Sequence, residues 1–266
     1  MTKSKWALAI ASLLLVLMSY FVPEIAQSNQ PVNHNFNNNN SQNLEIRFLN
    51  NEPDGSRRGR PNNRVGTGSR GNCPSVDLLT TALIPEKNVG LTIDEAPSFW
   101  FFVPYQPKQI PIGEFVLQNE ANEEIYQTYF TLSNTPGVVK LTVPSTVSMK
   151  INKDYQWYFK LYCSKERLLN PIFVRGWVQK IAIQPNLKAL LKSDTKSRQH
   201  VAIYAENGIW YSALSELAQL RLNEPKNPIL LKDWANLLQD IDLADLASKP
   251  IVGEVKKESS ALSIVN

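Results

Sequence analysis

Five arginine side chains close together form the clearest candidate for a chemical site in this chain. They are Arg57, Arg58, Arg60, Arg64 and Arg70. Guanidinium groups bind carboxylates and phosphates through paired hydrogen bonds, and no acidic residue lies among these positions, so this arginine cluster predicts an anion-binding site. Its ligand would be an anionic glycan, peptidoglycan, a lipid headgroup or an acidic protein partner. The alternative is a solvated basic linker.

Aromatic side chains beside polar ones predict a second binding surface. Apolar and polar residues alternate along residues 155–163, so the apolar ones face the core while Tyr158 and Tyr162 share the polar face. Arg175 and Trp177 share one face of a later strand, where a cation and a ring can bind a carboxylated sugar. The alternative for this pair is an arginine stacked on tryptophan at a sheet edge. We predict that these four residues contact a glycan or a protein partner.

A glycine-rich motif in the same region does not predict a nucleotide site. The letters GTGSRG at residues 66–71 match the G-x-G-x-x-G pattern of dinucleotide-binding loops. Such a loop needs a strand before it and a helix after it, so that the helix N-terminus meets the pyrophosphate. Pro61 precedes the motif and Pro74 follows it, so we interpret it as a turn and expect no cofactor.

Catalytic and metal-binding side chains are few. The two histidines are His34, in an asparagine-rich stretch, and His200, which we interpret as structural. The sequence contains no G-x-S-x-G motif, and a Ser–His–Asp triad is therefore not expected. Asp240, Asp242 and Asp245 lack the glycine and the distal glutamate of a calcium loop, and we expect no metal.

The elements that must position these residues are mainly strands. Seven strand-like runs are separated by proline, glycine or asparagine, at spacings typical of a sandwich or barrel. They span residues 89–94, 98–105, 113–118, 124–132, 137–143, 155–163 and 171–183. Helical patterns begin only after Pro185, which argues against an alternating α/β enzyme. The sequence predicts an α+β fold, an immunoglobulin-like or fibronectin-like antiparallel β-sandwich followed by a helical hairpin and a third helix.

Three local patterns refine this fold. Tyr155 follows Met149 across a polar turn, which resembles the tyrosine corner of such sandwiches, with a coincidental turn as the alternative. The run FWFFVPY at residues 99–105 is apolar on both faces, which favours a buried strand over an aromatic platform for sugars. A tetratricopeptide-like hairpin, or an unrelated hairpin with a glycine turn, is indicated by Tyr204, Gly208, Trp210, Ala213, Leu217 and Pro225. One such repeat cannot bury its apolar face alone, so we expect the helices to dock on the sandwich or on a partner.

The N-terminus has the pattern of an export signal. Lys3 and Lys5 precede an apolar run over residues 6–22, with cleavage expected after Ala26. The run is also at the lower limit for a membrane span of about 20 residues, so an uncleaved anchor is the alternative and the only membrane contact expected. Both readings place the body in the periplasm or outside the cell. The net charge of +4 is too small to predict nucleic acid binding.

The remaining boundaries follow from composition. Residues 27–56 are rich in asparagine and predict a disordered tether, and residues 248–266 predict a disordered tail. Between them we expect a sandwich domain over residues 57–184 and helices over residues 185–247. The two cysteines, Cys73 and Cys163, are expected to form a disulfide because exported thiols usually pair, with two free thiols as the alternative.

Several motifs together resemble an uncharacterised secreted cyanobacterial family, domain of unknown function 928. They are GRPNNR at 59–64, GSRG at 68–71 with Cys73, FWFFVPY at 99–105, YQW at 155–157, RGW at 175–177 and GIWY at 208–211. The resemblance covers about residues 57–245 of this sequence. It implies an exported protein, but it implies no activity and no catalytic residues.

Two functions of different kinds follow from these observations. The leading hypothesis is a secreted, non-catalytic module of the cell envelope that binds a ligand or a protein. The alternative is a secreted glycan hydrolase, which needs only two carboxylates about 5 to 9 Å apart. Glu95, Glu114, Glu123 and Glu124 are too commonplace to nominate as such a pair.

Overall fold

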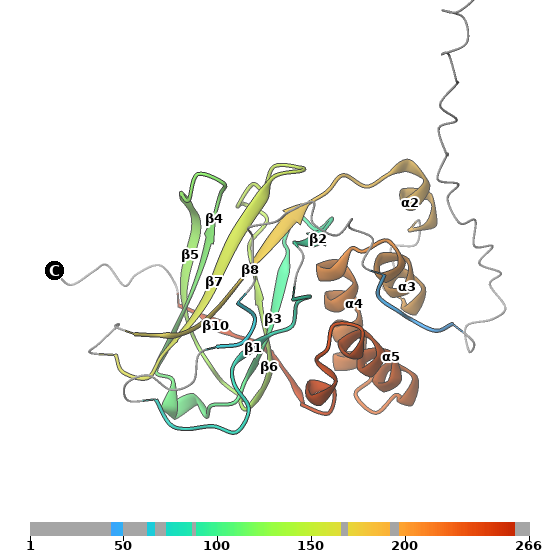
Figure 1. Cartoon of the computed structure of the whole chain (residues 1–266). Helices are drawn as coiled ribbons and strands as arrows, with labels where there is room; N and C mark the ends of the chain where they lie inside the picture. Colours follow the sequence, from blue (N-terminus) through green and yellow to red (C-terminus); the bar gives the residue numbers. More distant parts are fainter. Residues whose placement is uncertain are drawn as a thin grey trace, which may run out of the picture. The chain divides into compact units, whose positions relative to one another are not determined.

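The computed structural model describes residues 44–49, 63–66, 73–86, 89–165, 170–191 and 197–258. The predicted export signal, most of the tether, and Arg57, Arg58, Arg60 and Arg70 lie outside these residues. The described part is an α+β fold in which two sheets face each other and helices lie beside them (Figure 1). Among the described residues, eight strands precede the α-helices, as the sequence predicts, and two short strands follow them, which it does not predict.

The smaller sheet has four strands in the order β1-β3-β6-β9. Its strands are β1 (Thr81–Ala82), β3 (Ser98–Val103), β6 (Gly137–Thr142) and β9 (Ile251–Glu254). The larger sheet has six strands in the order β10-β5-β4-β7-β8-β2. Its strands are β2 (Gly90–Thr92), β4 (Ile112–Gln118), β5 (Glu124–Thr131), β7 (Asp154–Tyr162), β8 (Ile172–Lys180) and β10 (Lys256–Lys257). A short 3-10 helix, η2 (Pro107–Gln109), precedes β4.

Both sheets are mixed, whereas the sequence predicted a wholly antiparallel sandwich. β2 pairs with β8 in parallel, and β9 pairs with β6 in parallel. Each of these two strands is short, lies at the edge of its sheet and pairs with a strand from a distant part of the chain. Hairpin patterns in the sequence report only neighbouring strands, so they carry no signal for such pairs.

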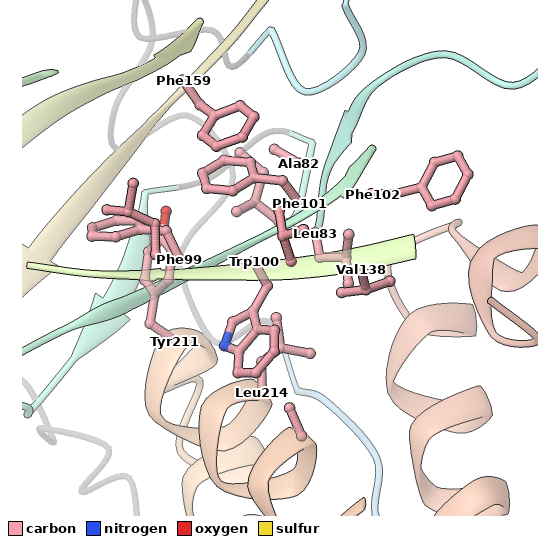
Figure 2. Close-up of a cluster of buried hydrophobic side chains, with 14 of the residues drawn as sticks. Ala82, Leu83, Phe99, Trp100, Phe101, Phe102, Val138, Phe159, Tyr211 and Leu214 are labelled. Carbon is pink, nitrogen blue, oxygen red and sulfur yellow. The ribbon is translucent and has the colours of Figure 1, made fainter. Parts of the chain in front are cut away.

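The strand β3 lies at the centre of the core. Phe99 and Phe101 point toward the larger sheet, where Phe101 stacks on Phe159 with ring centroids 3.9 Å apart (Figure 2). Trp100 points the other way, toward Leu214 on α4 (Trp210–Asn223), and its Nε1 donates to Ser215 Oγ at 3.0 Å. Both faces of β3 are therefore buried, which confirms the core interpretation of the FWFFVPY run.

Three main helices pack together beside the smaller sheet. They are α3 (Arg198–Glu206), α4 and α5 (Pro228–Gln239), with the short α2 (Pro185–Leu190) and η3 (Ala244–Leu246) flanking them. Gly208 turns the chain between α3 and α4 with a φ of 71°, a left-handed conformation that favours glycine. α4 packs on β2 and β3, and α3 and α5 pack on α4, so the helices dock on the sheets through α4. None of the helices among the described residues is long and apolar enough to cross a membrane.

Tyr211 of α4 joins the helices to the larger sheet. Trp157 Nε1 donates to the Tyr211 hydroxyl at 2.8 Å, and that hydroxyl donates to the carbonyl oxygen of Trp177 at 3.1 Å. Gly90 leaves the space for this ring, because a Cβ there would lie 2.3 Å from Tyr211 Cε2.

The structure contains the predicted disulfide and the hydrogen bond predicted for Tyr155. Cys73 and Cys163 form a disulfide that ties the start of the sandwich to the end of β7, with their Cα atoms 5.3 Å apart. The Tyr155 hydroxyl accepts the backbone N–H of Lys150 at 2.8 Å, as a tyrosine corner requires.

Two segments expected to lack structure are part of the fold. Residues 44–49 of the predicted tether lie against the helices, and Ile46 is fully buried. Residues 251–257 of the predicted tail form β9 and β10, which add to β6 and β5 respectively. Both predictions are wrong for these residues, because composition reports the mean polarity of a segment and not the few apolar side chains that dock it.

Candidate functional site

The sequence-predicted contact residues gather on one face of the larger sheet. Side chains alternate along a strand, so residues between the core positions of β4, β7 and β8 point away from the smaller sheet. We call this surface the outer sheet face. Its members on these strands are Glu114, Val116, Gln156, Tyr158, Lys160, Tyr162, Phe173, Arg175 and Trp177. The register places Arg175 opposite Tyr158, and Trp177 opposite Gln156.

Arg175 is the central cation of the outer sheet face. Its side chain is half-buried, and its Nε is inaccessible to solvent and has no hydrogen-bond partner among the residues that the structure describes. Its backbone exchanges two hydrogen bonds with Asn63, with N···O distances of 3.0 and 2.9 Å. Arg64 of the predicted cluster directly follows Asn63, so its backbone lies beside β8.

The glycine of the RGW motif has a packing role. A Cβ at Gly176 would lie 2.4 Å from Trp157 Cζ2 and 2.6 Å from Ile84 Cδ1, both in the core. Glycine at this inward position lets Arg175 and Trp177 occupy successive outward positions without displacing the core.

A buried carboxylate organises the other end of the outer sheet face. Glu114 accepts hydrogen bonds from Gln127 Nε2 at 2.8 Å, from Lys160 Nζ at 3.2 Å and from the Tyr162 hydroxyl. Tyr162 was predicted as a ligand contact, but its side chain is only 6% exposed and its hydroxyl is engaged by Glu114. Tyr158 is half-buried and donates to Gln156 Oε1 at 2.8 Å. The outer sheet face therefore presents side chains that are already held in position.

The pKa of Glu114 reflects this network. Burial opposes its ionisation, but hydrogen bonds from Tyr162 and Gln127 and the charge of Lys160 outweigh burial, so the pKa of Glu114 lies below its usual value. Burial and the bond to Glu114 raise the pKa of Tyr162 far above its ordinary value. A general acid needs a raised carboxyl pKa, so Glu114 does not suit that role. The sequence did contain a signal for Glu114, because the inward Phe115 and Leu117 place it on the same face as Tyr162.

A comparison with known families identifies the family of this chain. A family model described as Domain of Unknown Function (DUF928) matches residues 65–251. The chain belongs to this family. No curated protein matches the sequence. The DUF928 region contains the four predicted contact residues, the disulfide and all of α3, α4 and α5.

One arginine of the predicted cluster lies just before the DUF928 region. Arg64 Nη1 donates to the carbonyl oxygen of Ile241 at 2.6 Å and approaches that of Ile84 at 3.4 Å. Its Nη2 lies 4.0 Å from Glu86. Arg64 thus connects the start of the sandwich to the chain after α5. Anion binding by the cluster as a whole stays a prediction.

The histidine of the DUF928 region lies between two helices. His200 Nδ1 is 3.2 Å from Glu216 Oε1, and the same oxygen accepts the backbone N–H of Ser197 at 2.8 Å. Nearby, Ser212 Oγ donates to Asp94 Oδ2 at 3.0 Å and joins α4 to the end of β2. No three potential metal-ligating side chains come together within the described ranges. The His200–Glu216 contact joins α3 to α4, in agreement with the structural interpretation of His200. The Ser212–Asp94 bond joins α4 to the sheet.

Proposed function

We propose that this DUF928 protein is an exported, non-catalytic binding module of the cell envelope, and that its outer sheet face binds a carboxylated glycan. The observation that carries the proposal is the register of β7 and β8. It brings Arg175 between Tyr158 on the neighbouring strand and Trp177 on its own strand. A guanidinium beside two aromatic rings is suited to a carboxylate attached to a sugar ring.

The state of the side chains supports binding at this face. Arg175, Tyr158 and Trp177 are half-buried, so little side-chain freedom remains to be lost when a ligand binds. The Glu114–Tyr162–Lys160 network fixes the polar groups beside them. Asn63, whose backbone pairs with Arg175, lies between Arg60 and Arg64 in the sequence, and the proposal is that this arginine cluster adds positive charge to the site.

The proposal also includes export of the protein and a more specific fold class. The disulfide favours an oxidising compartment, because such bonds persist in secreted proteins and are rare in the cytosol. The signal-like N-terminus and the resemblance to a secreted cyanobacterial family agree with this. The Tyr155–Lys150 bond supports an immunoglobulin-like or fibronectin-like sandwich, and the Gly208 turn supports a tetratricopeptide-like hairpin.

Isothermal titration calorimetry tests the proposal. The exported chain is titrated with a uronic acid polymer and, separately, with a neutral polymer of equal length. We expect the acidic polymer to bind and Arg175→Gln to weaken it about 10- to 150-fold, the worth of a hydrogen-bonded charge. Lys226→Gln, an equal charge change at an exposed position between α4 and α5, serves as the matched control and should bind like the wild type. Absence of binding by the wild type, or equal binding by the two variants, would refute the assignment.

The same samples separate binding from hydrolysis. A non-catalytic module leaves the polymer intact, so no new reducing ends should appear during incubation. Steady release of reducing ends would support the glycan hydrolase alternative and would overturn the non-catalytic part of the proposal.

A further inference from the structure

The helices hold an extended segment of the chain in a groove. Residues 44–49 run parallel to α3, because Arg198 at its start donates to the Leu44 carbonyl at 2.7 Å and Ala205 near its end accepts the Leu49 N–H at 3.1 Å. On the other side, Asp240 at the end of α5 accepts the Phe48 N–H at 2.7 Å. The segment is therefore fastened through its backbone at three points.

Side chains of this segment alternate between the groove and the solvent. Ile46 is fully buried, and Phe48 packs edge-on against Trp210 with ring centroids 4.8 Å apart. Glu45, Arg47 and Leu49 are exposed. Arg47 reaches across to Asp240, with Nε 3.2 Å from Oδ2. Backbone bonds at fixed points, with pockets for alternate side chains, are the usual means by which a protein recognises an extended peptide.

The groove extends beyond the described part of this segment. A cavity of about 490 Å³ adjoins Leu44 and Glu45, with Arg198 and α5 forming the rest of its lining. Ile229 lines the cavity and is 40% exposed, and Lys232 adds a cation. This volume lies within the range of about 300 to 1,000 Å³ that ligand sites occupy.

The groove and its occupant differ in whether the family model covers them. α3, α4 and α5 lie inside the DUF928 region, whereas residues 44–49 lie outside it. We propose that the groove between α3 and α5 is a peptide-binding site, and that residues 44–49 occupy it in place of an extended segment of a protein partner. The partner segment carries two apolar side chains at alternate positions with an arginine between them, as Ile46, Arg47 and Phe48 do. This site is separate from the outer sheet face and does not depend on glycan binding.

Competition between residues 44–49 and an added peptide can be measured in the full chain. The variant Ile46→Asp places a charge in the apolar pocket and frees the groove. The probe is a fluorescein-labelled synthetic peptide with the sequence of residues 43–50, NLEIRFLN. A tethered segment acts at an effective concentration on the order of 1 mM, so for a peptide Kd of about 10 µM the wild type should bind about 100-fold more weakly than Ile46→Asp.

Fluorescence anisotropy with two controls decides the result. Leu49→Asp introduces the same side chain at a position 49% exposed, so its groove should stay occupied and it should bind like the wild type. A probe with the Ile46→Asp change should not bind any variant. A folded Ile46→Asp protein that fails to bind the probe, or a wild type that binds it equally well, would refute the proposal.

A second measurement avoids any folding defect of the variant. A protease site inserted after Asn51 lets the segment be cut from the folded wild-type chain. The cut fragment should dissociate on dilution and exchange with the labelled probe, and a fragment that does neither would count against an exchangeable site. Wild-type dimers that disappear in Ile46→Asp would make a second copy the occupant and would overturn the assignment to a separate partner.

Discussion

Loss of the disulfide should lower stability by an amount set by the loop that it closes. Cys73 and Cys163 are separated by 90 positions in the sequence. The chain-entropy relation for a loop of this length gives about 4.6 kcal/mol at 25 °C. For a domain of this size the expected decrease in Tm is about 9 to 18 °C. The urea midpoint should fall by about 1.5 to 2.3 M for a slope of 2 to 3 kcal/mol per M.

Single and double alanine variants test this value. Each of Cys73→Ala, Cys163→Ala and the double variant lacks the same bond, so all three should lose nearly the same stability. Urea unfolding followed by tryptophan fluorescence measures the three midpoints. Reduction of the wild type with dithiothreitol should reproduce the value of the variants, because the loop constraint is lost in each case.

Additivity would contradict the reasoning. If the two single variants had small effects that summed in the double variant, the thiols would act independently and no bond would exist in the native protein. Two free thiols detected by mass spectrometry of the alkylated native protein would lead to the same conclusion. A decrease in Tm under about 3 °C would show that the covalent loop hardly restricts the unfolded chain.

Three further predictions concern the core and the outer sheet face. Tyr211→Phe leaves the buried Trp157 Nε1 without its acceptor and removes the bond to the Trp177 carbonyl, so it should cost about 2 to 4 kcal/mol in urea unfolding. Gly176→Ala places a Cβ against the core and should cost about 1 to 3 kcal/mol in the same assay. The folded pKa of Glu114 lies below its ordinary value of 4.5, so its contribution to stability is complete above about pH 5 and is lost as the pH falls through the folded pKa. Urea midpoints measured from pH 6 downward should therefore fall less steeply for Glu114→Gln, and an unchanged slope would show that the network does not act.

The local patterns of this sequence determined the identity and the faces of the main elements. Alternation along residues 155–163 placed Trp157 and Phe159 in the core, and the two-sided apolar run around Phe101 predicted a strand buried on both faces. Gly208 and the apolar spacing around it predicted the helical hairpin. These patterns are reliable because the repeat of a strand or helix is a property of a few consecutive residues, and burial selects apolar side chains at that repeat.

Contacts between distant parts of the chain depend on the three-dimensional fold. The strand pattern places Tyr162 outward and predicts a ligand contact, yet the register of β4 on β7 brings Glu114 within hydrogen-bonding distance of its hydroxyl. The docking of residues 44–49 on the helices and of β9 on β6 depends on a few side chains and on backbone hydrogen bonds between distant segments. Pairing between distant strands and docking into a groove depend on the positions of both partners, and no repeat within one segment contains that information.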